Sequence, residues 1–391
     1  MITVNEAKKI IAENIELSAV GRIPLHKANG LVLAADVKSA ICVPPFDNSA
    51  MDGFAFKHDA NNTGFIVSQN IKAGDYSYAA LPDGEAARIF TGAPIPEGAD
   101  TVIQQEFVKI NGNRIEFDKS LAHRGINVRL KGAQCAAGEV IAKSGCVVTP
   151  GLIGLLVSAG IVEAPVYLPP TVAIIATGSE LRPPGTPLKP GEIYNSNSPA
   201  IQAYLEQIGI KNISEFYADD DLNLLKEKTA FCLEHFDVLI LSGGISAGEY
   251  DHVQNALVDS GVPTLFYKVK QKPGKPLLVG KKNKKWIFAL PGNPAAALVC
   301  FNQYIKPCIK GMTGENNIFI PDYRLPVANG FKKKKSLTYF LKAKMISNEA
   351  VILSGQDSFN LLPFNEADCF AEAEEGTECL EPGTTVNIYS W

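Results

Sequence analysis

The stretch Asp237–Asp251, DVLILSGGISAGEYD, is the segment from which the fold can be worked out. It begins with four apolar residues in a row, Val238–Leu241, a run typical of a strand buried on both faces of a parallel sheet. Ser242, Gly243 and Gly244 then end the strand, and glycine allows positive φ angles and a close approach of the backbone to an anion. In open α/β sheets, ligands bind at this carboxyl end of the strands.

Three polar residues, Ser246, Glu249 and Asp251, follow the two glycines in the same loop. Carboxylates beside a phosphate-binding loop indicate a divalent metal that bridges carboxylate and phosphate oxygens. The alternative is a strand, a tight loop and a helix start that bind no ligand. The stretch taken alone is compatible with a ligand site and with a loop that binds nothing, so the choice depends on the rest of the chain.

The chain around this stretch alternates apolar runs with helical patterns. Expected strands are 172–176, 213–217, 238–241, 265–269 and 286–290, and expected helices are 200–208, 222–234, 253–258 and 295–305. This alternation predicts a parallel sheet with helices on both faces. Acidic and small polar residues follow the strand ends at Thr177–Glu180 and at Asp219, and one sheet edge would collect them.

Two turns in the same region suit an anion. The sequence KPGKP (272–276) places Lys272 and Lys275 around a Pro-Gly pair, so compact positive charges flank exposed backbone N–H groups. The sequence PGNP (291–294) ends a strand and opens a helix, whose N-terminus favours anions. Carboxylates and lysines on one edge predict metal-assisted chemistry on a phosphate or a similar oxyanion. The Walker pattern G-x-x-x-x-G-K-[ST] is absent from the sequence.

The regions before and after this α/β part have different sequence patterns. Thr3 and Glu6 form a capping box that predicts an N-terminal helix. The loop VPPFDNSAMDGFA (43–55) is dense in Asp, Asn and Ser, which indicates a site rather than a plain linker. Prolines stiffen a second loop, 91–100. Short β-like runs fill 64–150, and those in 318–391 predict a small β-barrel or sandwich.

The composition excludes several classes of protein. A net charge of −4 with 46% hydrophobic and 20% charged residues is typical of an ordinary globular protein and argues against a nucleic-acid partner. The eight cysteines form no C-x-x-C pair, which argues against zinc and thioredoxin-like sites. We recognise no signal peptide and no apolar run of about 18 residues, so we expect a cytoplasmic protein without a membrane partner.

Seven segments together resemble the molybdopterin molybdenumtransferases, the MoeA and gephyrin E-domain family. They are PPFDNSAMDGFA (44–55), TGAPIPEGADTVI (91–103), ATGSEL (176–181), NSNSPAI (195–201), SGGISAGEYD (242–251), KPGKP (272–276) and LPGNPAAA (290–297). Each segment alone is weakly specific. All seven in this order and at this spacing are specific, and they extend the resemblance over essentially the whole chain.

The resemblance implies a multidomain α/β plus β protein. Residues 1–45 with 136–168 would form an elongated linker and dimerisation domain, whose first helix can pack on the α/β domain. Residues 46–135 would form a small β domain, 169–315 a MogA-like doubly wound parallel-sheet domain that binds molybdopterin, and 316–391 a C-terminal β-barrel domain.

The activity that the resemblance implies is the insertion of molybdate into adenylylated molybdopterin with Mg²⁺, releasing AMP and molybdenum cofactor. The family works as a homodimer, with a cleft between the α/β domain of one subunit and the small β domain of the other. The implied partners are a MogA-like protein that adenylylates molybdopterin and the apoproteins of molybdoenzymes.

Site residues follow from the matching positions. The catalytic residues would be Asp52, Thr91, Glu180, Asp219 and Asp251, and the metal would lie on Glu180, Asp219 and Asp251. The substrate-binding residues would be Ser242, Gly243, Gly244, Ser246, Lys272, Lys275, Pro291, Gly292, Asn293, Pro294, Lys342 and Ser358.

Two positions depart from the family pattern. Gln134 stands where the family usually has an acid, and Lys342 stands where a molybdate-binding arginine is usual. Lysine keeps the charge but lacks the planar, paired donors of arginine. A catalytically weakened or scaffolding pterin-binding paralogue therefore stays as one alternative. A MogA-like adenylyltransferase that consumes ATP is another, against which the additional β domains argue.

Overall fold

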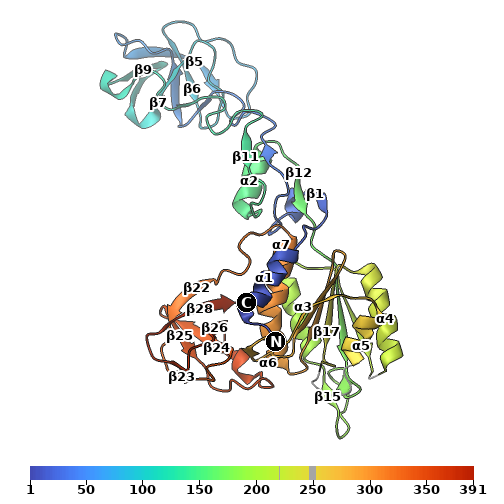
Figure 1. The fold of residues 1–391 in the computed structure, drawn as a ribbon. Coiled ribbons are helices and arrows are strands. Elements are labelled where there is room, and N and C mark those ends of the chain that lie inside the picture. The colour runs from blue at the N-terminus through green and yellow to red at the C-terminus, as the bar shows by residue number, and fades with distance from the viewer. Residues whose placement is uncertain (220, 246–251) are drawn as a thin grey trace. The chain divides into compact units, whose positions relative to one another are not determined.

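The computed structural model describes residues 1–219, 221–245 and 252–391 (Figure 1). The chain divides into two compact units, each of which is described by itself. The first unit comprises Met1–Gly21, Gly30–Ala34 and Val166–Trp391, and the second comprises Arg22–Asn29 and Ala35–Pro165. Within the described residues, no helix has the length and apolar character needed to cross a membrane.

A six-stranded sheet forms the centre of the first unit, in the order β16-β13-β17-β21-β20-β18. Its strands are β13 (Val172–Thr177), β16 (Ile213–Ala218), β17 (Val238–Ser242), β18 (Thr264–Tyr267), β20 (Leu278–Lys282) and β21 (Lys285–Leu290). The strands β16, β13, β17 and β21 are parallel, which confirms the predicted α/β fold. The sequence did not predict β20, which forms an antiparallel hairpin with β21 around Asn283 at φ 55°.

Successive side chains of the central strands enter two different cores. In β13, Val172 and Ile174 lie in one core, and Ala173 and Ile175 lie in the other. The first core packs against α1 (Val4–Asn14), α3 (Asn197–Gln207), α6 (Pro294–Cys300) and α7 (Lys306–Met312); the second packs against α4 (Leu222–His235) and α5 (His252–Asp259). Figure 1 shows these two sets of helices on opposite sides of β17. Both faces are buried, so the strands are apolar without alternation.

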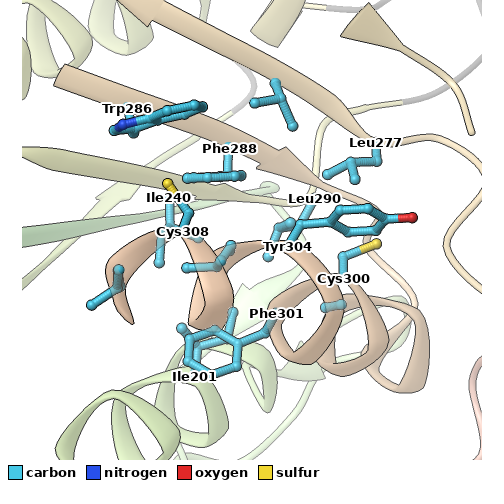
Figure 2. Packing of buried hydrophobic residues seen from close by; sticks show 14 of the residues in the cluster. Ile201, Ile240, Leu277, Trp286, Phe288, Leu290, Cys300, Phe301, Tyr304 and Cys308 are labelled. Carbon is cyan, nitrogen blue, oxygen red and sulfur yellow. The ribbon is translucent and has the colours of Figure 1, made fainter. Parts of the chain in front are cut away.

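The helices begin where the sequence places capping groups. The Thr3 hydroxyl accepts a hydrogen bond from Glu6 N at 3.2 Å, and Glu6 Oε2 accepts one from Thr3 N at 2.8 Å. The Asp221 carboxylate likewise accepts bonds from two backbone N–H groups of the first turn of α4. The helix expected over 295–305 is α6 followed by a π-helical turn, Phe301–Ile305, that leads into α7. Figure 2 shows Cys308 and Tyr304 of this helical segment beside Ile240 and Leu290 of the sheet, and Phe301 beside Ile201 of α3.

The C-terminal part of the first unit is a β domain, as predicted. Its strands are β22 (Tyr323–Pro326), β23 (Phe331–Lys332), β24 (Thr338–Ile346), β25 (Glu349–Ile352), β26 (Cys369–Ala373), β27 (Cys379–Leu380) and β28 (Thr385–Ser390). The short strand β19 (Gln271–Lys272) joins the edge of this sheet by pairing in parallel with β24. Phe340 and Phe370 reach from this domain into the first core of the α/β domain. The KPGK turn therefore starts inside the sheet of the C-terminal domain.

The second unit is built around another six-stranded sheet, in the order β7-β4-β6-β5-β9-β8. The strands are β4 (Gly53–Phe56), β5 (Gly64–Ile71), β6 (Glu85–Ile89), β7 (Thr101–Gln104), β8 (Val108–Asn111) and β9 (Arg114–Phe117). The rings of Phe56, Phe65 and Phe117 form its core, with centroids 4.6 to 6.1 Å apart. The unit also contains α2 (Pro150–Ser158) and the paired short strands β2 (Val37–Lys38) and β11 (Val140–Ala142).

Candidate active site

The two glycines after β17 lie directly on the end of the neighbouring strand β13. Gly243 has φ 96° and Gly244 has φ 70°. A Cβ atom on Gly243 would lie 2.6 Å from the carbonyl oxygen of Thr177, and one on Gly244 would lie 2.8 Å from its hydroxyl oxygen. Only glycine fits this approach, because any side chain would collide with Thr177. The loop therefore starts as a tight turn at the carboxyl edge of the sheet, with Gly243 buried and Gly244 exposed.

Asn197, in the first turn of α3, joins this loop to the loop after β21. Its Nδ2 donates hydrogen bonds to Ser242 Oγ at 3.0 Å and to Gly292 O at 2.9 Å. Asn197 is 9% exposed, and its Oδ1 has no hydrogen-bond partner among the described residues. An acceptor buried without a partner is costly, so this oxygen marks a place for a donor. Asn197 is not among the site residues predicted from the sequence, although it belongs to the NSNSPAI segment (195–201).

Two of the three predicted metal ligands belong to the described residues. Glu180 follows β13 and Asp219 follows β16, two neighbouring strands in which Thr177 and Ala218 are register partners. Both acids are exposed. The Glu180 carboxylate folds back over its strand end, because a Cβ on Gly178 would lie 2.5 Å from Glu180 Oε2. The third predicted ligand, Asp251, and the predicted substrate residue Ser246 lie outside the described residues.

The donor set suits Mg²⁺, which uses one or two protein carboxylates and completes its shell with water and substrate phosphates. Glu180 and Asp219 supply two such carboxylates at one edge. Over the described ranges, no three His, Cys, Asp or Glu side chains form a group that could hold a metal. The two acids thus fit a metal that is shared with a phosphate-bearing substrate.

The KPGK turn lies against the first turns of α6. Gly274 has φ 89°, and a Cβ there would lie 2.7 Å from Cys300 Sγ and 3.3 Å from Ala296 O. Lys272 and Lys275 are both exposed on this turn. Lys272 Nζ lies 5.5 Å from the ring centroid of Tyr339, its partner in the β19–β24 pair. The two lysines are therefore the exposed parts of a turn whose glycine is packed against a helix.

The PGNP loop meets the C-terminal domain at Ser358. Asn293 Nδ2 donates a hydrogen bond to Ser358 Oγ at 2.8 Å, and Ala295 N donates one to Ser358 O at 3.0 Å. Pro294 is the first residue of α6, a position where its missing N–H costs nothing. Pro291 is buried, whereas Gly292 and Asn293 are exposed. The loop is thus held between the α/β sheet and the C-terminal domain.

The position of Lys342 corrects the expectation that its ammonium group faces a bound oxyanion. The side chain is 2% exposed. Its Nζ donates hydrogen bonds to the carbonyl oxygens of Gly355, Asp357 and Asn360 at 2.7, 3.2 and 2.8 Å. Burial lowers the pKa of Lys342 to about 8. An ammonium group has three donors, all of which are used here, so Lys342 instead fastens the loop that contains Ser358.

In the second unit, Asp52 and Thr91 are brought together. Asp52 Oδ1 accepts hydrogen bonds from Thr91 N and from Thr91 Oγ1, both at 2.8 Å. The backbone N–H of Thr91, followed by its hydroxyl, holds the pKa of the Asp52 carboxyl below its ordinary value. The loops around them are joined by bonds from Ser49 N to Ala93 O and from Gly92 N to Ser49 O. Gln134 is exposed, and its N–H donates to Val43 O.

Comparisons with known proteins cover nearly the whole chain. Residues 2–160 match the family description "MoeA N-terminal region (domain I and II)", 173–311 match "Probable molybdopterin binding domain", and 324–391 match "MoeA C-terminal region (domain IV)". The molybdopterin molybdenumtransferase of Staphylococcus aureus is 32% identical over 404 residues, which span 99% of this chain and 95% of that protein. The enzyme of the same name from Staphylococcus epidermidis is 31% identical over 399 residues, with the same coverage.

Solved structures show the same fold over the full length. A crystal structure of the molybdopterin biosynthesis MoeA protein from Pyrococcus horikoshii is similar with a TM-score of 0.82 and 29% sequence identity, and it covers 100% of this chain and 99% of that one. A second crystal structure of a MoeA protein from that organism gives a TM-score of 0.85 at 26% identity and covers 100% of both chains.

Proposed function

The chain belongs to the MoeA family of molybdopterin molybdenumtransferases, and we propose that it inserts molybdate into adenylylated molybdopterin in a Mg²⁺-dependent reaction. The products are AMP and molybdenum cofactor. The two alternatives, a scaffolding paralogue and an ATP-dependent adenylyltransferase, make different predictions for the same assay.

One observation supports this proposal above the others: three separate segments meet around the start of α6. Asn197 bonds to Gly292 just before the helix. The KPGK turn lies against Ala296 and Cys300. Ser358 bonds to Asn293 and to the backbone of Ala295. Groups suited to a pterin phosphate and cations suited to an oxyanion therefore lie around one helix start.

The pterin substrate is assigned to the sheet edge. The backbone of Ser242, Gly243 and Gly244 can approach a phosphate closely because Gly243 and Gly244 have no side chains and take positive φ. The unpaired Asn197 Oδ1 can accept a hydrogen bond from an N–H group of the pterin ring system. A pterin that binds here leaves its phosphate beside the carboxylates.

Glu180 and Asp219, together with Asp251, are the proposed holders of Mg²⁺. When bound, the metal would neutralise charge on the phosphate and so favour release of AMP. Glu180 is positioned for this by its own backbone, because its carbonyl accepts a hydrogen bond from Ile193 N at 2.9 Å. Its carboxylate stays on the outside of the strand end, where a hydrated ion can reach it.

Molybdate, the second substrate, is assigned to Lys272 and Lys275. A tetrahedral dianion binds best to cations that are fixed before it arrives, because ordering them on binding would cost entropy. The Ser358 hydroxyl accepts a bond from Asn293 and can still donate its own proton to an oxyanion oxygen. Lys342 contributes indirectly by holding the loop of Ser358.

Assembly and partners complete the proposal. We propose a homodimer in which Asp52 and Thr91 also serve the reaction, with a MogA-like adenylyltransferase as supplier of the substrate and molybdoenzyme apoproteins as recipients. Sedimentation should give twice the mass of the chain. If two chains contribute to each reaction, a mixture of Asp52→Ala and Asp219→Asn proteins should recover part of the activity that each has lost. A fully active monomer would contradict this assembly.

The central experiment incubates the purified protein with adenylylated molybdopterin, molybdate and Mg²⁺ and measures AMP. We expect AMP release that requires both molybdate and the metal, and a product that activates an apo-molybdoenzyme. A scaffolding paralogue would bind the pterin and release no AMP. An adenylyltransferase would instead consume ATP in the presence of unmodified molybdopterin, so omission of molybdate and addition of ATP separate the two readings.

A further inference from the structure

Gln271, directly before Lys272, is a polar residue buried beneath the KPGK turn. Its side chain is 1% exposed and lies at the edge of the first core. We propose that Gln271 and Tyr304 are positioning residues that hold Lys272 and Lys275 in place for the oxyanion. The inference rests on the proposed function, in which those lysines bind molybdate.

The amide group of Gln271 forms a hydrogen bond across the turn on its buried side. Its Nε2 donates to the carbonyl oxygen of Gly274 at 3.1 Å and lies 3.6 Å from Cys300 Sγ. The Cys300 thiol lies 3.7 Å from the same Gly274 oxygen. The Gly274 carbonyl, between the two lysines, is therefore held by two buried side chains. The absence of a side chain at Gly274 makes this possible, since a Cβ would lie 2.7 Å from both partners.

Tyr304 fixes the orientation of that amide. Its hydroxyl donates a hydrogen bond to Gln271 Oε1. The Gly274 carbonyl can only accept, so the NH₂ group of Gln271 must face the turn and its oxygen must face Tyr304. Tyr304 is fully buried, and burial raises the pKa of its hydroxyl well above the ordinary value. The hydroxyl therefore keeps its proton and remains a donor at every working pH.

The surroundings of this polar group are apolar, which is why its bonds matter. Figure 2 shows Tyr304 and Cys300 side by side near Leu277, at the edge of a core of aromatic and aliphatic side chains. A buried amide is costly unless its donors and acceptor are paired, and loss of one partner leaves the other unsatisfied. The tyrosine, the amide and the turn therefore hold one another in a single arrangement.

The backbone on the far side of the turn is fixed as well. Val269 N and Leu277 N both donate to the carbonyl oxygen of Lys275, at 3.0 and 3.1 Å. Lys272 is fixed by the β19–β24 pair and by the ring of Tyr339. The Cα positions of both lysines are thus set before any ligand binds, so that only their side-chain ends have to be ordered by molybdate.

Three variants test the proposal. Tyr304→Phe removes one donor and leaves the ring in place, whereas Gln271→Leu removes the whole amide. Tyr204→Phe is the matched control, because Tyr204 belongs to α3 and packs on Phe301 of the same core. The readouts are molybdate binding by calorimetry, AMP release as a function of molybdate, and backbone hydrogen exchange of the segment 271–277.

We expect Tyr304→Phe to weaken molybdate binding about fivefold, as for the loss of one hydrogen bond. The KM for molybdate should rise with kcat nearly unchanged, binding of adenylylated pterin should stay as in the wild type, and hydrogen exchange of 271–277 should become faster. Tyr204→Phe should behave as the wild type in all readouts. Gln271→Leu should weaken molybdate binding more than Tyr304→Phe does. If Gln271→Leu does not fold, the results for Tyr304→Phe alone test the proposal.

Unchanged hydrogen exchange and unchanged molybdate binding in Tyr304→Phe would overturn the proposal, as would equal effects of Tyr204→Phe. A failure of the proposed function would give a different set of results from a failure of this inference. In that case the wild type would bind no molybdate or release no AMP, while the exchange of 271–277 would still report whether Tyr304 holds the turn.

Discussion

Asn293 donates a hydrogen bond of 2.8 Å from its Nδ2 to the hydroxyl oxygen of Ser358. This contact joins a loop of the parallel sheet to a loop of the C-terminal β domain, 65 positions further along the chain. The backbone of Ala295 reinforces it by donating to Ser358 O. The turn that carries the proposed oxyanion lysines packs against the same helix through Gly274. The orientation of Ser358 should therefore affect the binding of molybdate more than the binding of the pterin.

Replacement of this serine tests that relationship. Ser358→Ala removes the acceptor of Asn293 and the donor proposed for the oxyanion. We expect molybdate to bind at least about tenfold more weakly, as for the loss of a hydrogen bond to a charged group. Adenylylated pterin should bind as before. Ser354→Ala, which changes an exposed serine of the same loop, is the control. Equal molybdate binding curves for Ser358→Ala and Ser354→Ala would show that Ser358 is not part of the molybdate site.

Lys342→Arg distinguishes a residue that supports a loop from a residue that binds an oxyanion. The three carbonyl groups around Lys342 Nζ leave no space for a planar guanidinium, so the variant should be less stable by about 1–3 kcal/mol, as for other overpacked interiors. Molybdate binding should not tighten. A clear gain in molybdate affinity, measured by calorimetry, would place the side chain in the oxyanion shell instead.

The same lysine predicts a pH dependence of stability. Its folded-state pKa of about 8 lies below the ordinary value of 10.5, because burial disfavours the charged form. Below pH 8 both the folded and the unfolded chain hold the proton, and the cost of the buried charge is fully present. Between pH 8 and 10.5 only the unfolded chain holds it, so the free energy of unfolding should rise with pH, by at most about 3 kcal/mol.

Denaturant unfolding of wild type and Lys342→Met at several pH values checks this dependence. Methionine does not titrate, so the difference in unfolding free energy between the two proteins should change in favour of the wild type as the pH rises from 8 to 10.5. A difference that is constant with pH would show that Lys342 keeps an ordinary pKa.

Asp52→Ala tests the acid of the second unit. The change removes the acceptor of two hydrogen bonds from Thr91. We expect AMP release to fall on the order of 10²-fold, as for a misplaced reacting group, while the protein stays folded. Asp118→Ala is a matched control, because Asp118 Oδ1 accepts bonds from Ser120 N and Ser120 Oγ in the same way and is outside the predicted site. Equal activity of the two variants would contradict a role for Asp52.

Asp219→Asn tests the proposed metal ligand. Asparagine retains one oxygen but loses the charge, so the Mg²⁺ concentration for half-maximal AMP release should rise about tenfold or more. Chelation of the metal should abolish AMP release in the wild type. Glu227→Gln, at an exposed position of α4, changes the net charge equally and should leave the metal dependence unchanged. Full activity of Asp219→Asn in chelator would exclude the site.

Several features of this protein were determined by the sequence alone, since they depend on neighbours in the chain. The run Val238–Leu241 predicted a strand buried on both faces, and its side chains do enter two cores. Thr3 and Glu6 predicted a helix start, because capping is satisfied within three residues. Gly243 and Gly244 predicted positive φ angles, which they have. The order of the seven motifs predicted the family.

Other features were decided only by the tertiary structure. A lysine at position 342 predicts a positive charge near the site, yet the loop that folds over it directs that charge to three carbonyl groups. Gln271 looks like an ordinary polar residue until Tyr304, from a π-helical turn, meets its amide in the core. Asn197 becomes a link only when two loops reach it from different strands. The physical reason is the same in each case. Periodicity and capping report which face of a segment is buried, whereas the partner of a buried polar group is chosen by packing between segments distant in the chain.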